Sequence, residues 1–225
     1  LQGGGMTLNA VEHALRAGDD HRVVDLIETL GWEMVTQGET VTLMRWIDAL
    51  PDALLRGRPS LCLFYGWGLA LTGQLEAVES YMQGFDLTRR SGEVVELDAN
   101  LAALYSYVAG QRDDPARALA LSDHAAAHLP ADKPFLRCLV AMNQGTALLN
   151  LGQPKAAADA LREAIRLSAV VALDYFTLIL TSLLGQVYEM QGQLQRAFDL
   201  HQEALTAATR EGAQPAPFAG VAYLG

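Results

Sequence analysis

The sequence predicts an all-α protein made of helical hairpins that stack side by side. The main observation is a motif that recurs forty residues later with one spacing of glycine and alanine: Gly145, Gly152, Ala157 and Ala164, then Gly185, Gly192, Ala197 and Ala204. Hydrophobic residues make up 51% of the chain, and no alternating strand pattern competes. Because one hairpin is too small to bury its own apolar face, stacked neighbours must share a core. The expected role is recognition rather than catalysis.

Two earlier stretches carry looser copies of the motif. The copy that begins at Gly66 has the same spacing, with larger residues where the later copies have alanine. The copy that begins at Ala103 has seven residues rather than four between Gly110 and Ala118. Asp113-Asp114-Pro115 accommodates this insertion, since aspartate caps a helix and proline suits its first turn, so the next helix should start near Pro115. The turn glycines are predicted to end each first helix in a left-handed conformation: Gly73, Gly110, Gly152 and Gly192.

The elements follow in order along the chain. Helices are predicted over 8–17 and 21–37, then an irregular stretch over 39–58 that closes at Leu50-Pro51 and holds a short helix near 52–56. Helix pairs follow at 60–72 and 74–90, 93–109 and 115–128, 133–151 and 154–169, and 173–191 and 193–211. One domain is therefore expected over 1–225, with an irregular N-terminal part (6–58), repeats (59–92, 93–130, 133–170 and 173–212) and the start of a truncated repeat (215–225).

Composition narrows the function. With 16 basic against 26 acidic residues the net charge is −10, which disfavours contact with nucleic-acid phosphates. The apolar runs are shorter than the roughly 20 residues that span a bilayer, and no secretory signal is evident. Cys62 and Cys138 lie on apolar first helices of different repeats and are expected to be buried small hydrophobes. A soluble, cytoplasmic protein is expected, as a piece of a longer chain.

The motif resembles the tetratricopeptide family, which places Leu-Gly, an aromatic, a turn glycine and two alanines at the spacing of these residues: Leu184, Gly185, Tyr188, Gly192, Ala197 and Ala204. The longer period, the segment Trp46-Ile47-Asp48-Ala49-Leu50-Pro51 and the segment Arg58-Pro59-Ser60-Leu61-Cys62-Leu63 resemble the sensor region of MalT-like, large ATP-binding LuxR-type transcription regulators. This resemblance implies a right-handed superhelix that binds an inducer and helps the activated protein to oligomerise.

The resemblance also implies a concave groove lined by the first helix of each pair. Carried over to this chain, the groove takes in Leu63, Trp67, Ala70, Asn100, Leu104, Tyr107, Met142, Thr146, Asn150, Ser182, Gln186 and Glu189. The candidate ligand contacts are the flat rings and hydrogen-bonding groups of this set, which suit a small neutral ligand: Trp67, Asn100, Tyr107, Asn150, Gln186 and Glu189. Aromatics at helical spacing also fill cores, and that alternative stays open for each of them.

Other chemistry is less well supported. His124 and His128 are four residues apart on a helix, but no third metal ligand accompanies them, so a solvated helix end is expected. No nucleophile with an oriented base, phosphate-binding loop or recognition helix stands out, so neither an enzyme nor a cofactor is expected. The expected partner is a small-molecule effector, with possible self-association. The alternative is an interaction scaffold whose groove holds a partner's peptide or helix.

Overall fold

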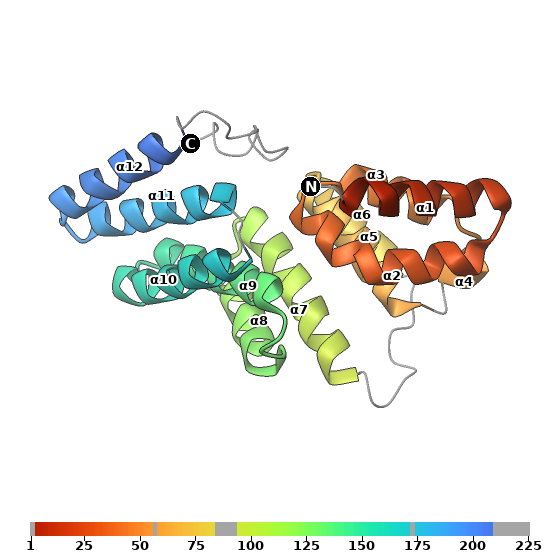
Figure 1. Ribbon diagram of the computed structural model, residues 1–225. Helices are drawn as coiled ribbons and strands as arrows, with labels where there is room; N and C mark the ends of the chain where they lie inside the picture. Colours follow the sequence, from red (N-terminus) through yellow and green to blue (C-terminus); the bar gives the residue numbers. More distant parts are fainter. Residues whose placement is uncertain (1–2, 56–57, 84–93, 172–173, 209–225) are drawn as a thin grey trace. The chain divides into compact units, whose positions relative to one another are not determined.

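The computed structural model describes residues 3–55, 58–83, 94–171 and 174–208, and the regular structure in these ranges is helical. The chain divides into two compact units, Leu1–Arg90 and Ser91–Gly225, and each is described by itself (Figure 1). The all-α class with paired neighbouring helices is confirmed. One continuous array over 1–225 stays a prediction. None of the described helices is both long and apolar enough to cross a membrane.

The N-terminal unit is organised around one buried helix. It contains α1 (Gly3–Ala17), α2 (Asp20–Thr36), α3 (Thr40–Asp48), α4 (Asp52–Leu55), α5 (Pro59–Leu71) and α6 (Leu75–Gln83). Helices α2, α3, α4 and α6 all contact α5, which is apolar nearly all round and therefore suits a central position. The stretch 39–58, which the sequence predicts to be irregular, contains a nine-residue helix, α3. This helix buries Leu43, Trp46 and Ile47.

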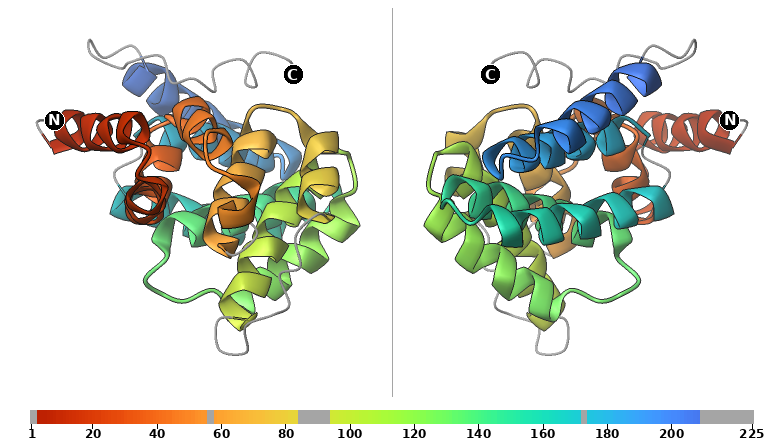
Figure 2. Two further views of the ribbon diagram at one scale, coloured as in Figure 1. Left: turned by 90° about the vertical axis from the view of Figure 1, so that its right-hand side faces the viewer. Right: turned by 90° about the vertical axis from the view of Figure 1, so that its left-hand side faces the viewer.

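The C-terminal unit consists of three hairpins in sequence. They are α7 (Val94–Gln111) with α8 (Pro115–His128), α9 (Pro134–Asn150) with α10 (Pro154–Val170), and α11 (Asp174–Met190) with α12 (Leu194–Ala208). Helices α8 and α10 also contact the first helix of the following hairpin, and α9 touches both α7 and α11. The green to blue helices in Figure 2 show this stack from two sides. Neighbouring hairpins therefore bury one another's apolar faces.

Left-handed turns close the first helices. Gly73, Gly152 and Gly192 have φ angles of 80°, 70° and 71°, a region that glycine enters without steric cost. The residue after each glycine donates its backbone N–H to a carbonyl five residues earlier: Gln74 to Leu69 and Gln153 to Leu148, both at 2.8 Å. This Schellman arrangement satisfies carbonyls that the helix end would leave unpaired.

The prediction of a left-handed turn was wrong for Gly110. This glycine lies inside α7, and Asp113 takes the positive φ, at 57°. The three inserted residues extend the helix before the turn, so the turn position moves with them. Asp114 then donates its N–H to the Ala109 carbonyl at 3.0 Å and caps α8 by accepting from the Arg117 N–H at 3.1 Å. The predicted start of α8 at Pro115 is confirmed.

Two equivalent glycines pack against different neighbours. A Cβ on Gly145 would lie 2.6 Å from Leu161 Cγ, whereas a Cβ on Gly185 would lie 2.5 Å from His201 Cε1. Leu161 has no exposed surface, while the His201 side chain is 38% exposed. The leucine is therefore held by the core, and the imidazole can rotate toward solvent.

We expect Gly145→Ala to destabilise the C-terminal unit and Gly185→Ala to be neutral or stabilising. Overpacking at Gly145 costs about 1–3 kcal/mol, against a gain of about 1 kcal/mol in helix propensity. Gly185→Ala keeps that gain and displaces only the exposed contact of His201 with Glu189, which is worth about 0–1 kcal/mol. Urea unfolding of the two variants, followed by far-UV circular dichroism, measures the difference. Equal destabilisation of both would contradict the packing argument.

Candidate ligand-binding surface

Trp67 lies inside the N-terminal unit. Its exposed fraction is 0%, and the edge of its ring meets Trp32, with ring centroids 6.5 Å apart. Trp32 also packs edge-to-face on Phe64 at 5.2 Å. Since a ligand cannot reach a fully buried ring, the structure places Trp67 in the core rather than on a groove wall. Trp67 thus fills space between α2 and α5, which is the alternative that the sequence left open for aromatic residues at helical spacing.

The two candidates on α7 differ in exposure. Asn100 is only 5% exposed, whereas Tyr107 is half-buried. Burial raises the pKa of Tyr107, and a hydrogen bond with Gln111 acts in the opposite direction. The phenol therefore stays neutral near pH 7 and offers a hydrogen bond together with part of its ring face.

The candidates on α9 and α11 are exposed. Asn150 lies at the end of α9, and Gln186 lies in the middle of α11. Glu189 is also exposed, but its Oε1 lies 3.3 Å from His201 Nε2 on α12. This contact holds the carboxylate toward the second helix of its own hairpin. Of the six predicted residues, Asn150, Gln186 and Glu189 are therefore exposed and Tyr107 is half-buried, and Glu189 already contacts His201.

A buried polar contact that sequence reasoning missed joins neighbouring first helices. Asn143 Nδ2 on α9 donates to Ser106 Oγ on α7 at 2.8 Å, and Ser106 Oγ donates to the Ala103 carbonyl at 2.8 Å. Asn143 is 8% exposed and Ser106 is fully buried. Two polar residues in apolar helices were the available signal. Because a buried polar group must be paired, this contact fixes the register of α7 against α9.

Tyr188 of α11 contacts two arginines from the neighbouring helices α10 and α12. Arg162 Nη2 of α10 donates to Tyr188 Oη at 2.9 Å, and the Arg196 guanidinium of α12 lies 4.9 Å from the ring centroid. Arg162 also contacts Asp159 at 2.7 Å. The Tyr188 hydroxyl and the Asp159 carboxylate raise the pKa of the Arg162 guanidinium. The repeat aromatic thus joins three helices and serves packing between hairpins.

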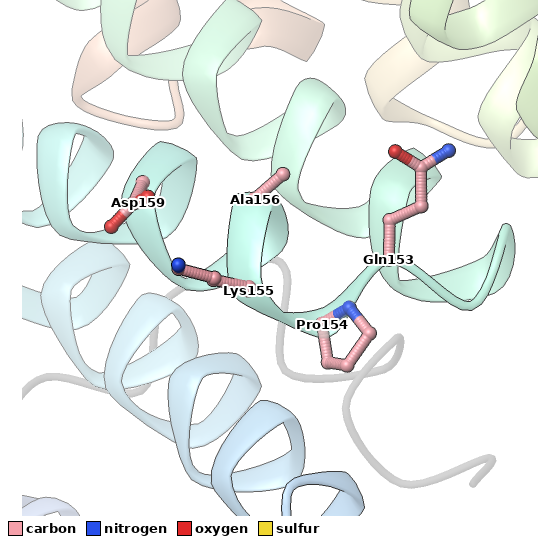
Figure 3. A pocket seen from close by; sticks show the side chains of 5 residues that line it. All are labelled: Gln153, Pro154, Lys155, Ala156 and Asp159. Carbon is pink, nitrogen blue, oxygen red and sulfur yellow. The ribbon is translucent and has the colours of Figure 1, made fainter.

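An open hollow of about 370 Å³ lies at the start of α10. Gln153, Pro154, Lys155, Ala156 and Asp159 line it. Figure 3 shows these side chains following one another along the first turns of the helix. None of the six predicted residues belongs to this hollow, so it gives no support to the predicted groove.

The two histidines of α8 are occupied by protein contacts. His124 Nε2 lies 2.6 Å from Asp98 Oδ2 of α7, and His128 Nδ1 lies 2.8 Å from the His124 carbonyl. Among the residues that the structure describes, no group of three His, Cys, Asp or Glu side chains could hold a metal ion. The pair therefore ties α8 to α7 and to its own last turn.

Comparison with known proteins identifies the repeat type. The family model described as the MalT-like TPR region matches residues 99–225, which is more than half of the chain. The chain belongs to the MalT-like TPR family. This match begins within α7, so it includes the α7–α12 stack and all the candidate residues except Trp67.

Relatives of this MalT-like TPR chain extend the similarity to its N-terminal unit. It is 25% identical over 197 residues to the HTH-type transcriptional regulator MalT of Vibrio parahaemolyticus, covering 85% of this chain and 22% of that protein. The MalT regulators of Vibrio campbellii and Yersinia pestis are 23% and 22% identical, over 92% and 93% of the chain and 23% and 19% of their own lengths. The chain spans about a fifth of these relatives. The resemblance stated from the sequence is confirmed.

A solved structure supports the fold alone. The chain resembles the crystal structure described as MamA protein with a TM-score of 0.50 and 14% sequence identity. The match covers 82% of this chain and 91% of the MamA chain. At this identity the likeness concerns the arrangement of helices and says nothing of a ligand.

The two segments that carry the MalT-like resemblance have structural roles. Trp46 and Leu61 are 1% and 0% exposed. Arg58 Nη1 donates to Glu28 Oε2 at 3.0 Å, and Ser60 Oγ donates to Glu28 Oε1 at 2.6 Å. Glu28 of α2 thereby anchors the start of α5. These residues build the N-terminal unit of the MalT-like chain rather than a ligand surface.

The two cysteines of the MalT-like chain are free and buried. Cys62 Sγ donates to the Leu55 carbonyl at 3.5 Å, and Cys138 Sγ donates to the Ala164 carbonyl at 3.3 Å. Burial raises the pKa of both thiols to about 12, so they stay protonated and unreactive near pH 7. Their predicted place as small hydrophobes in the core is confirmed.

Proposed function

We propose that this chain is the effector-recognition region of a cytoplasmic transcription regulator. The observation that carries this proposal is membership of the MalT-like TPR family over residues 99–225. Relatives named HTH-type transcriptional regulators match more than four fifths of the chain. Stacked hairpins of this kind present a broad surface, which suits the recognition of a signal.

The ligand surface in this proposal is the first-helix face of the C-terminal unit. Helices α7, α9 and α11 are neighbours, because α9 contacts both of the others. Tyr107, Asn150 and Gln186 remain accessible on them. One phenol and two amides suit a small neutral ligand that carries hydroxyl or carbonyl groups, since amides both donate and accept hydrogen bonds.

Charge on these helices disfavours the scaffold alternative in its peptide-terminus form. Capture of a carboxylate requires lysine or arginine, and α7 and α11 contain neither. The arginine of α9 is Arg137, whose Nη1 donates to the Leu129 carbonyl at 3.1 Å. The first-helix face therefore lacks a cationic clamp, which favours a neutral ligand over a chain terminus.

Activation in this proposal is a shift between two states of the regulator. A ligand favours self-association only if it binds the associating state more tightly than the other state. In this proposal the predicted oligomerisation is the self-association of the ligand-bound state. It involves the whole regulator rather than the ligand face alone.

A thermal-shift screen against sugars, oligosaccharides, amino acids and apolar metabolites tests the proposal. Ligand at 100 times its dissociation constant should stabilise the fold by about 2.7 kcal/mol. Asn150→Ala and Gln186→Ala should abolish the shift without changing the unliganded stability, because both side chains are exposed. Lys155→Ala on α10 is the matched control and should leave the shift unchanged.

Each outcome of this screen decides something. A shift that survives in both amide variants would refute the position of the site. No shift with any compound would refute small-molecule sensing and favour the interaction scaffold, for which a partner peptide or helix is the next probe.

A further inference from the structure

Two guanidinium groups from different hairpins meet at the ring of Tyr188. Arg162 Nη2 donates to Tyr188 Oη at 2.9 Å, and the Arg162 guanidinium carbon lies 5.9 Å from the centre of the ring. The Arg196 guanidinium carbon lies 4.9 Å from the same centre. Helix α11 packs against both α10 and α12. The packing of the two hairpins therefore brings both positive charges to one tyrosine.

The Tyr188 hydroxyl group is buried and still has a proton to donate. Tyr188 is only 6% exposed. Its oxygen accepts from Arg162, and a guanidinium has no acceptor to offer in return, so the O–H must be directed to another group. No acceptor for this O–H lies among the residues that the structure describes. Because a buried donor gains a full hydrogen bond from any oxygen that reaches it, this hydroxyl group points to a ligand.

Arg196 pairs with no carboxylate in the described ranges, although the chain carries 26 acidic residues. Its Nη1 donates to Gln193 Oε1 at 2.8 Å. Asp199, the acidic residue one turn further along α12, instead accepts from a glutamine of its own helix at 2.9 Å. Arg162 is paired with one carboxylate, that of Asp159, at 2.7 Å. The two guanidiniums therefore carry one uncompensated positive charge.

We propose that Tyr188, Arg162 and Arg196 bind the phosphate group of a small ligand. The fork of a guanidinium matches the oxygens of phosphate and of carboxylate, and such charge-assisted hydrogen bonds are stronger than neutral ones. Phosphate is favoured, because it offers three oxygens to the three side chains and carries a charge of about −2, whereas a carboxylate offers two oxygens and a single charge.

Space for the remainder of such a ligand adjoins Arg162. Asp159, which pairs with Arg162, also lines the open hollow of about 370 Å³ at the start of α10. Lys155 lines the same hollow one turn earlier (Figure 3). A phosphate monoester therefore fits with its phosphate at the two arginines and its organic part toward the hollow. This site uses none of the residues proposed for the neutral effector and goes beyond that function.

Isothermal titration calorimetry of the full 225-residue chain with inorganic phosphate tests the proposal, with sodium chloride holding the ionic strength constant. Arg196→Gln removes an exposed guanidinium, and Tyr188→Phe removes the hydroxyl group while keeping the ring. Each substitution should weaken phosphate binding by about tenfold or more, because each removes a charge-assisted hydrogen bond. Far-UV circular dichroism of both variants should match that of the parent chain.

Arg166→Gln is the matched control. Arg166 lies one turn beyond Arg162 on α10 and carries the same charge, but it donates to both oxygens of Glu163, at 2.7 and 2.6 Å. Its replacement should leave phosphate affinity unchanged. If Arg166→Gln weakened binding as much as Arg196→Gln, the proposal would be overturned, because binding would then follow net charge alone.

Acetate and glycerol phosphate serve as further probes of the ligand class. Acetate should bind more weakly than phosphate, and equal affinity would overturn the assignment to phosphate. Tighter binding of glycerol phosphate than of inorganic phosphate would support the site and name a phosphate monoester as its ligand. Equal or weaker binding of glycerol phosphate would support it with inorganic phosphate as the ligand. No saturable binding of either phosphate compound would overturn the proposal.

Discussion

Replacing Trp67 with alanine is expected to lower the free energy of unfolding of the N-terminal unit by about 3–5 kcal/mol. The side chain has no exposed surface, and its ring packs against Trp32. Truncation therefore removes a large buried apolar area and leaves a cavity that the surrounding helices fill only in part. The three tryptophans of the chain, Trp32, Trp46 and Trp67, all lie in this unit, so tryptophan fluorescence during urea unfolding measures its stability.

Trp32→Ala is the matched comparison, because Trp32 belongs to the same aromatic cluster but is only partly buried. We expect it to cost less than Trp67→Ala. A further variant, Trp67→Phe, should retain part of the stability because most of the apolar contact remains. If Trp67→Ala instead left stability within about 0.5 kcal/mol of the parent, a value usual for surface positions, its place in the core would be refuted.

The sequence predicted the helices well because turn chemistry marks their ends. Gly152 and Gly192 supply the left-handed residue that a helix needs at its C-terminus, and Pro115 starts the next helix after an aspartate cap. These signals are local, so they survive without knowledge of the packing. The prediction failed at Gly110 because the inserted residues lengthen the helix, so that Asp113 rather than Gly110 adopts the left-handed conformation. The spacing of the motif alone does not show on which side of the glycine the insertion lies.

The candidate site was harder to predict because the first helices carry apolar residues nearly all round. In α5 the consecutive residues Leu61, Cys62, Leu63 and Phe64 are all buried, so no period distinguishes a groove face from a core face. Long-range partners were hidden for the same reason. The contact of Glu189 with His201 and the buried bond of Asn143 with Ser106 depend on which helices meet.

Leu161→Ala is expected to destabilise the C-terminal unit by about 2–5 kcal/mol. Leu161 is fully buried in the cluster that joins α9, α10 and α11. It lies directly over Gly145, where a Cβ would meet Leu161 Cγ at 2.6 Å. The glycine therefore makes room for this leucine, and the two positions share one volume.

That shared volume predicts a change of sign in Gly145→Ala. In the parent chain the added methyl group clashes with Leu161 and destabilises the unit. In the Leu161→Ala background the same methyl enters the vacated space and should become stabilising, because it fills part of the cavity and raises helix propensity. The coupling between the two substitutions should reach at least about 1 kcal/mol, within the range for residues in contact.

Far-UV circular dichroism and tryptophan fluorescence, measured together during urea unfolding, show which unit loses stability in these variants. The C-terminal unit contains no tryptophan among its residues 91–225, so far-UV circular dichroism should show helix lost at lower urea while tryptophan fluorescence stays unchanged. Additive effects of Leu161→Ala and Gly145→Ala would contradict the shared volume. Such additivity would mean that Gly145 is needed only for its backbone conformation. Strong coupling would mean that glycine is needed at this position because Leu161 of the facing helix occupies the space that a Cβ would fill.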